Sequence, residues 1–143
     1  MENVATILRK NHRHFKKISP SASIENALVQ MSSRNVEYLI VMDEDENFRG
    51  LLTEHDITKK AIFINRPMAQ IKVMEIMNTL LPFADINNSL GHCMRLMKQF
   101  NIRHLPVFDN LHFHGIISSD DILQELIHEK AEMLEEEEYA GIY

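Results

Sequence analysis

Apolar residues recur along this chain in short runs and at helical spacings. The first such segment begins at Ser23, a good helix cap, and continues with apolar residues about one helical turn apart: Ile24, Ala27, Leu28 and Met31. The uninterrupted apolar run Tyr38–Met42 predicts a buried strand. An acidic turn at residues 43–47 leads into Phe48–Leu52, which predicts a hairpin, and a second helix follows from Thr53 to about residue 64.

The same order of elements recurs 66 residues later. Ser89 opens a helix whose apolar residues match those of the first: Leu90, Cys93, Met94 and Met97. The run His104–Phe108 repeats the buried strand, and a turn at Asp109–Asn110 leads into a strand over residues 111–117. The last helix is predicted from Ser118 to about residue 136.

Shorter matches surround these copies and set their boundaries. An extended piece precedes each helix, at residues 18–20 and 81–84, and Val4–Leu8 is similar to Val73–Met77. The chain is therefore predicted to hold two copies of one unit, residues 1–66 and 67–143. The first begins with a basic helix, and the second ends with a long acidic one.

Pro106 lies inside the strand of the second copy. Proline has no backbone N–H to donate to a neighbouring strand, so we expect this strand to lie at a sheet edge there or to carry a bulge.

Composition describes an ordinary globular chain of 143 residues, with 45% hydrophobic residues and a formal net charge of −6. A single cysteine fits a reducing compartment, and no secretory signal is visible, so we expect a cytoplasmic protein. No apolar run is long enough to span a membrane, and the acidic balance argues against general nucleic-acid binding. The charge is uneven, because basic residues gather in 1–17 and acidic residues in 119–143.

The motif with the clearest chemistry occurs twice. Gly50 and Gly115 each precede two aliphatic residues, then a hydroxyl residue, then an aspartate three residues further on: Thr53 with Asp56, and Ser118 with Asp121. Such a pair caps the start of a helix. The same groups, beside free backbone N–H groups, can also hold a sugar diol and a phosphate. Both interpretations remain open on the pattern alone.

The repeat resembles a tandem pair of CBS domains, also called a Bateman module. The resemblance rests on residues 103–109, on Gly115–Ile122 and on the linker Val73–Met77, and it covers roughly residues 4–127. It implies a mixed α/β (α+β) fold of two pseudo-twofold-related units. Each unit would run strand–helix–strand–strand–helix, and the two sheets would pack face to face. It also implies a stand-alone regulatory module with no catalytic domain attached.

The resemblance further implies two clefts for adenosine-type ligands such as AMP, ADP, ATP or S-adenosylmethionine. In the first cleft, Thr53 and Asp56 would hold ribose, Arg103 and His104 would face phosphate, and Ser19 and Val36 would line the adenine end. The second cleft would use Ser118 and Asp121, with Ala84 and Ile102 at the base and Glu37 and Tyr38 on the phosphate side.

The two predicted clefts differ in charge, because Arg103 in the first corresponds to Glu37 in the second. Two unit charges about 4 Å apart interact by about 4 kcal/mol at an effective dielectric near 20. We therefore expect the first cleft to bind a phosphorylated adenosine. The second would be empty or would prefer an uncharged adenosine moiety.

Other chemistry finds little support in the residues. No Gly-x-Ser-x-Gly or phosphate-loop pattern occurs, so we expect no catalytic activity and no required cofactor. His112 and His114 would share a strand face, but no cysteine lies near enough in sequence to complete a metal site, and none is expected.

The last helix presents an apolar stripe beyond what one short sheet needs: Ile122, Leu123, Leu126, Ile127 and Leu134, with Lys130 among them. Family modules pair through such helices, so we expect a homodimer, with an effector protein as a further possible partner. Two alternatives stay open. The chain could be a ligand-free interaction domain in which the hydroxyl–aspartate pairs are only caps, or residues 9–17 could bind nucleic acid.

Overall fold

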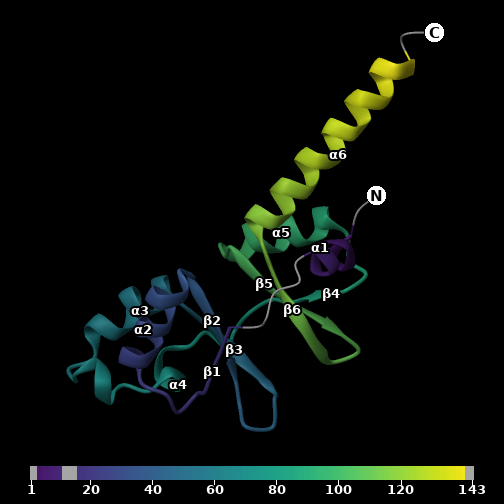
Figure 1. The fold of residues 1–143 in the computed structure, drawn as a ribbon. Helices are drawn as coiled ribbons and strands as arrows, with labels where there is room; N and C mark the ends of the chain where they lie inside the picture. The colour runs from purple at the N-terminus through teal and green to yellow at the C-terminus, as the bar shows by residue number, and fades with distance from the viewer. Residues whose placement is uncertain (1–2, 11–15, 141–143) are drawn as a thin grey trace. The chain divides into compact units, whose positions relative to one another are not determined.

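The computed structural model describes residues 3–10 and 16–140, which form two three-stranded sheets with their helices (Figure 1). The first sheet and its helices comprise β1 (Lys17–Ile18), α2 (Ile24–Arg34), β2 (Tyr38–Met42), β3 (Phe48–Thr53), α3 (Glu54–Lys60), the short 3-10 helices η1 (Ala61–Phe63) and η2 (Met68–Gln70), and α4 (Val73–Ile76). The remaining elements are α1 (Val4–Lys10), β4 (Ala84–Asp85), α5 (Leu90–Phe100), β5 (His104–Asp109), β6 (His112–Ser118) and α6 (Ser119–Ala140). The mixed fold and the strand–helix–strand–strand–helix order of both copies are as predicted.

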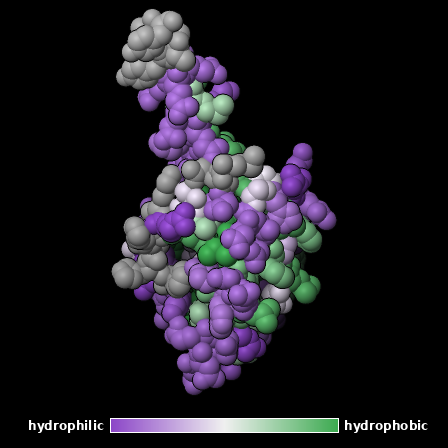
Figure 2. Space-filling view, turned by 90° about the vertical axis from the view of Figure 1, so that its right-hand side faces the viewer, coloured by the Kyte–Doolittle hydropathy of each residue, from purple (hydrophilic) through white to green (hydrophobic). Residues whose placement is uncertain are grey.

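The last helix of each copy differs in length. The predicted helix from Thr53 to residue 64 is the seven-residue α3 followed by η1, whereas α6 runs for 22 residues to Ala140. Figure 2 shows the projecting end of α6 as a mostly hydrophilic column. Only the first part of α6 therefore covers the sheet of its own unit.

In space the chain divides into two compact units at positions other than the sequence repeat. One unit is His14–Leu81, called here the first unit; the second unit joins Met1–Arg13 to Pro82–Tyr143. The boundary between residues 66 and 67 describes the repeat and not this spatial division. The short helix that precedes each copy in sequence belongs to the core of the other copy.

Matching backbone bridges explain this exchange of helices. Ser23, the cap of α2, bridges Lys72 just before α4, and Ser89, the cap of α5, bridges Asn3 just before α1. Val73 and Ile76 of α4 are buried in the core of the first unit, and Val4 and Ile7 of α1 are buried in the core of the second. The two short helices thus occupy equivalent places in the two units.

The strand register repeats as closely as the sequence does. In each sheet the short strand pairs in parallel with the middle strand, and the middle strand pairs antiparallel with the third. Val41 lies opposite Gly50 and Val107 opposite Gly115, and a register shift follows directly after each valine. The repeat predicted from residue spacing is therefore also a repeat of hydrogen-bond register.

Gly50 is required by a close approach of backbone. A Cβ atom at this position would lie 2.6 Å from the carbonyl oxygen of Asn78. Asn78 is held there because Leu51 and Asn78 exchange two backbone hydrogen bonds, of 3.1 and 2.8 Å. A side chain at residue 50 would push away the segment that follows α4.

Pro106 is placed in the middle strand of its sheet, where the predicted bulge follows one residue later, between Val107 and Phe108. The equivalent residue in the first unit is Ile40, whose N–H donates to the carbonyl oxygen of Lys16 at 2.8 Å. Proline cannot make that bond. Accordingly β4 begins to pair with β5 at Val107, one position later than the Lys17–Ile40 pair of β1 and β2.

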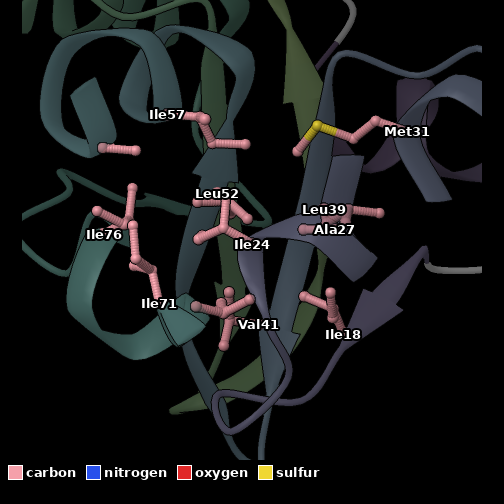
Figure 3. Close-up of a cluster of buried hydrophobic side chains, with 12 residues drawn as sticks. Ile18, Ile24, Ala27, Met31, Leu39, Val41, Leu52, Ile57, Ile71 and Ile76 are labelled. Atoms are coloured by element: carbon pink, nitrogen blue, oxygen red, sulfur yellow. The ribbon is translucent and has the colours of Figure 1, made fainter. Parts of the chain in front are cut away.

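Each unit has its own hydrophobic core beneath its sheet. Figure 3 shows the core of the first unit, where Ile24 and Met31 of α2 pack with Leu39, Val41 and Leu52 of the sheet. The second core is built from the equivalent residues of α5, β5 and β6, namely Leu90, Met97, Leu105, Val107 and Ile117. The predicted amphipathic faces are thus the faces that are buried, except at Met94 of α5, which was predicted on the apolar face but is 36% exposed.

Candidate functional site

Thr53 and Asp56 form a closed set of hydrogen bonds at the start of α3. The Thr53 hydroxyl accepts from the Asp56 N–H at 3.1 Å and donates to Asp56 Oδ2 at 2.9 Å, and the Thr53 N–H donates to the same oxygen at 3.0 Å. Asp56 is 9% exposed. The capping interpretation of this motif is therefore confirmed.

The second oxygen of Asp56 lies outside this set and faces a cation. Lys60 Nζ is 3.9 Å from Asp56 Oδ1 and donates to the carbonyl oxygen of Ile76 at 3.0 Å. Lys60 thus links the aspartate to the end of α4. Lys60 was not among the residues predicted from the sequence, although its position four residues after Asp56 on a helix places it on the same face.

Ser118 and Asp121 repeat the cap at the start of α6. The Asp121 N–H donates to the Ser118 hydroxyl at 3.0 Å, and the Ser118 N–H donates to Asp121 Oδ2 at 3.0 Å. The position equivalent to Lys60 is here Glu125, which is 7% exposed. The two caps therefore share their geometry, while the residue one turn further along has the opposite charge.

The sheet register places one more predicted residue beside each cap. Tyr38 lies directly opposite Thr53, and His104 directly opposite Ser118. Both are half-buried and make further contacts. Each unit thus carries a hydroxyl residue, an aspartate and a ring side chain at one end of its sheet.

The residues just before these rings differ in charge at equivalent backbone positions. The carbonyl oxygen of Glu37 accepts from the Glu54 N–H at 3.2 Å, and that of Arg103 accepts from the Ser119 N–H at 2.9 Å. Glu37 and Arg103 are both exposed. The predicted combination of Arg103 and His104 with Thr53 and Asp56 joins residues of different units and stays a prediction.

Two predicted lining residues lie toward the other end of their sheets. Ser19 directly follows Ile18, which pairs with Val41, and Ala84 pairs with Val107. Val41 and Val107 each lie three residues along the middle strand from Tyr38 and His104, the residues opposite the caps, which corresponds to about 10 Å at 3.3 Å per residue. Ser19 is exposed just after β1, and its hydroxyl lies 2.9 Å from that of Ser21. Ala84 is fully buried, so its side chain is a core contact.

Val36 and Ile102 follow the left-handed residues Asn35 and Asn101 that end α2 and α5. The Val36 N–H donates to the Met31 carbonyl at 3.0 Å, and the Ile102 N–H to the Met97 carbonyl at 2.9 Å. Both side chains are half-buried against their cores. Their backbone is fixed by the helix ends, whichever role their side chains have.

Other reactive side chains do not gather into a site in the described residues. Among residues 3–10 and 16–140, no three His, Cys, Asp or Glu side chains are grouped to hold a metal ion. His114 Nε2 lies 3.7 Å from Asp109 Oδ2. Burial raises the pKa of the Cys93 thiol to about 11, which disfavours its reactive thiolate form.

Comparison with known proteins identifies the family. The family described as CBS domain matches residues 2–62 and 73–128, so the chain belongs to the CBS domain family and holds a tandem pair. The CBS domain-containing protein YhcV of Bacillus subtilis is 32% identical over 105 residues, which cover 73% of this chain and 74% of that protein. The crystal structure of the CBS domain NE2398 is 33% identical, with a TM-score of 0.82, and the match covers 89% of this chain and 99% of that one.

A further solved structure shares the fold at lower identity. The CBS domain pair of protein MJ0100, in complex with 5′-methylthioadenosine and S-adenosyl-L-methionine, is 24% identical, with a TM-score of 0.75. That match covers 90% of this chain and 98% of that one.

Several relatives are longer than the region they share with this chain. The chain spans 30% of protein MJ1404 of Methanocaldococcus jannaschii and 20% of the homoserine O-acetyltransferase of Methanosalsum zhilinae. Within the described residues, no helix combines the length and apolarity needed to cross a membrane.

Proposed function

We propose that this protein is a non-catalytic regulatory module that binds an adenosine-containing ligand, with the ribose held by Asp56 and Asp121. The observation that carries the proposal is the repeated hydroxyl–aspartate pair at the same register position of both sheets, beside Tyr38 and His104. A structural cap alone requires no such neighbouring ring. The membership of the chain in the CBS family supports a regulatory role.

The chemistry of Asp56 fits a sugar diol. One carboxylate oxygen is used by Thr53, and the other faces only Lys60 at 3.9 Å, beyond hydrogen-bond distance, among the contacts described above. Two ribose hydroxyls can donate to this second oxygen in charge-assisted hydrogen bonds. The cap that Thr53 forms holds the carboxylate in the orientation that this contact requires.

We extend the proposal to ligand charge. This extension rests on the prediction, implied by the family resemblance, that each cleft combines residues of both units. Arg103 would then stabilise a phosphate in the first cleft, and Glu37 would repel one in the second. The first site therefore takes AMP, ADP or ATP, and the second is empty or takes an uncharged adenosine moiety. The CBS domain pair of protein MJ0100, which has the same fold, was solved with two adenosine compounds, and this supports an adenosine-type ligand in the proposal.

Calorimetric titration with adenosine, AMP, ADP, ATP and S-adenosylmethionine tests the proposal, with Asp56→Ala and Asp121→Ala as the informative variants. The matched control is Ser23→Ala, which removes a cap of the same kind at α2, where no ligand is proposed. Each variant loses a cap, which costs about 0.5–2 kcal/mol of stability. Only the aspartate variants should lose affinity, by about tenfold or more for a charge-assisted contact.

Equal affinity for AMP at both sites would contradict the charge assignment while leaving the binding proposal intact. If no adenosine compound binds, and mass spectrometry finds no small molecule released from the denatured protein, the sensor proposal fails.

The alternative is a ligand-free interaction domain. It is favoured by one observation, namely that in each pair the hydroxyl and one aspartate oxygen are hydrogen-bonded within the cap itself. In that case Asp56→Ala and Ser23→Ala would be indistinguishable in every binding assay and would differ only in stability.

The homodimer and the cytoplasmic location stay predictions, and sedimentation equilibrium of the full chain tests the dimer. The side chains of the basic segment beyond Arg9 lie largely outside the described residues. The prediction that residues 9–17 bind nucleic acid is tested by measuring retention of the protein on heparin before and after this segment is removed.

A further inference from the structure

Lys60 and Asp56 form a charged pair on one face of α3. Lys60 Nζ lies 3.9 Å from Asp56 Oδ1, the carboxylate oxygen that Thr53 does not use in the cap. The side chain of Lys60 is 42% exposed, and that of Asp56 is 12% exposed. The lysine ammonium is therefore the part of this pair that is most open to a ligand from solution.

The ammonium of Lys60 is also held by the backbone of α4. Lys60 Nζ donates to the Ile76 carbonyl oxygen at 3.0 Å. Ile76 is the last residue of α4, and the last carbonyl groups of a helix have no partner within that helix. The bond fixes the end of a long, flexible side chain, so less conformational entropy is left to be lost when a ligand binds.

The distance between the two charged atoms suits a bridging hydroxyl group. A direct hydrogen bond between them would need about 2.9 Å, so 3.9 Å is too long. A hydroxyl oxygen about 2.8 Å from both atoms fits this gap, because it can donate to the carboxylate and accept from the ammonium. An ammonium has three N–H donors, of which the Ile76 carbonyl takes one. The pair therefore offers an acceptor and a donor to the same hydroxyl group.

The second unit has a different side chain at this position. Glu125 follows Asp121 by four residues, as Lys60 follows Asp56, and it is 7% exposed. An ionised carboxylate accepts hydrogen bonds and donates none. A hydroxyl group bound at Asp121 would therefore receive no hydrogen bond from the residue one helical turn further along.

We propose that Lys60 is a specificity-determining residue of the first ribose site, where it donates to one sugar hydroxyl while Asp56 accepts from the same hydroxyl. This inference rests on the function proposed above and adds a requirement to it. The first site needs a hydroxyl that both donates and accepts, whereas the second needs only a hydroxyl that donates. Loss of this hydroxyl should thus cost the first site more affinity than the second.

The test is calorimetric titration with adenosine, 2′-deoxyadenosine and 3′-deoxyadenosine, which carry no phosphate that Lys60 could attract. The first site is isolated in an Asp121→Ala background. Lys60→Met removes the ammonium but keeps an apolar stem of similar length, and Lys60→Arg keeps a donor. The matched control is Lys59→Met, which removes the neighbouring lysine, also exposed on α3.

One of the two deoxy compounds should lose more affinity, relative to adenosine, in the Asp121→Ala protein than in its Lys60→Met variant. This excess should be about tenfold, as expected for a hydrogen bond to a charged group. Lys60→Arg should retain part of the excess, and Lys59→Met should retain all of it. In an Asp56→Ala background, which leaves only the second site, Lys60→Met should change no affinity.

Two results would overturn the inference while the proposed function stands. Lys60→Met could weaken the binding of adenosine and of both deoxy compounds by the same factor, which would make Lys60 only a structural link between α3 and α4. The excess could also persist in Lys60→Met. If adenosine does not bind to the unaltered chain, the proposed function fails and this inference fails with it.

Discussion

The first and second units share their backbone hydrogen bonds more closely than their side chains. Both have a serine cap bridged to the residue before a short helix, a left-handed asparagine after the first long helix, and a valine opposite a glycine before a register shift. They differ where the backbone plan allows it: Ile40 against Pro106, Lys60 against Glu125, and the seven-residue α3 against the 22-residue α6.

The shared features are those that the fold requires, and the differing residues are those that each unit can use for function. The shared residues satisfy caps and strand ends that would otherwise leave buried polar groups unpaired. Of the residues that differ, Ile40 and Pro106 are buried in the middle strands, Lys60 and Glu125 follow the caps by one helical turn, and the distal part of α6 is exposed. Lys60, Glu125 and the distal part of α6 are therefore the positions at which the two units can differ in function.

The exchange of short helices between the units gives the largest predicted effect. Replacing Ile7 or Ile76 by alanine removes a buried side chain from one core and should cost about 2–5 kcal/mol. Because Ile7 belongs to the core of the second unit, Ile7→Ala should speed hydrogen exchange in residues 84–118. Ile76→Ala should instead speed it in residues 18–57, as measured by mass spectrometry of peptic fragments.

Met74→Ala is the matched control, since Met74 lies on α4 but is 46% exposed. If Ile7→Ala loosened the first unit more than the second, the division into these units would be wrong.

The hairpin turn between β5 and β6 predicts an intermediate effect. Leu111 has a φ of 71° and is 94% exposed, so it bears left-handed strain without any packing in return. Leu111→Gly should therefore stabilise the protein by about 1 kcal/mol, as measured by urea unfolding.

Asn110 also has a positive φ, of 48°, but asparagine tolerates this conformation well. Asn110→Gly should accordingly change stability less than Leu111→Gly does. A destabilised Leu111→Gly protein would show that the leucine side chain contributes contacts of its own.

The smallest predicted effect concerns pH and the two short helices. Hydrogen bonds from Arg66 and from the Lys72 N–H lower the pKa of Glu75 at the start of α4. A carboxylate whose folded pKa is lowered contributes stability above its unfolded pKa and loses it as pH falls through the folded pKa. The equivalent residue of α1 is Thr6, which does not titrate.

The unaltered chain should therefore lose some stability against unfolding on acidification. The Glu75→Gln variant lacks this contribution at every pH. The unfolding midpoints of the unaltered chain and of Glu75→Gln, measured against pH, should converge as pH falls. A constant difference at all pH values would contradict a contribution from the charge of Glu75.

Much of the fold could be predicted because its signals are local. The serine caps, the helical spacing after Ser23 and Ser89, and the apolar runs of β2 and β5 each act within a few residues, and all were placed correctly. The caps at Thr53 and Ser118 were also recognised. Lys60 was missed because its second contact, the Ile76 carbonyl, lies 16 residues away in sequence.

The sequence by itself determined the family, the repeat and the order of elements, because periodicity, caps and turn residues act over one or two turns of chain. Only the tertiary structure decided which short helix completes which core, since Val4 and Ile7 have the same apolar character wherever they pack. It also decided why residue 50 is a glycine. A Cβ atom at residue 50 would lie 2.6 Å from the carbonyl oxygen of Asn78, which is 28 residues away in sequence, and no local pattern records that neighbour.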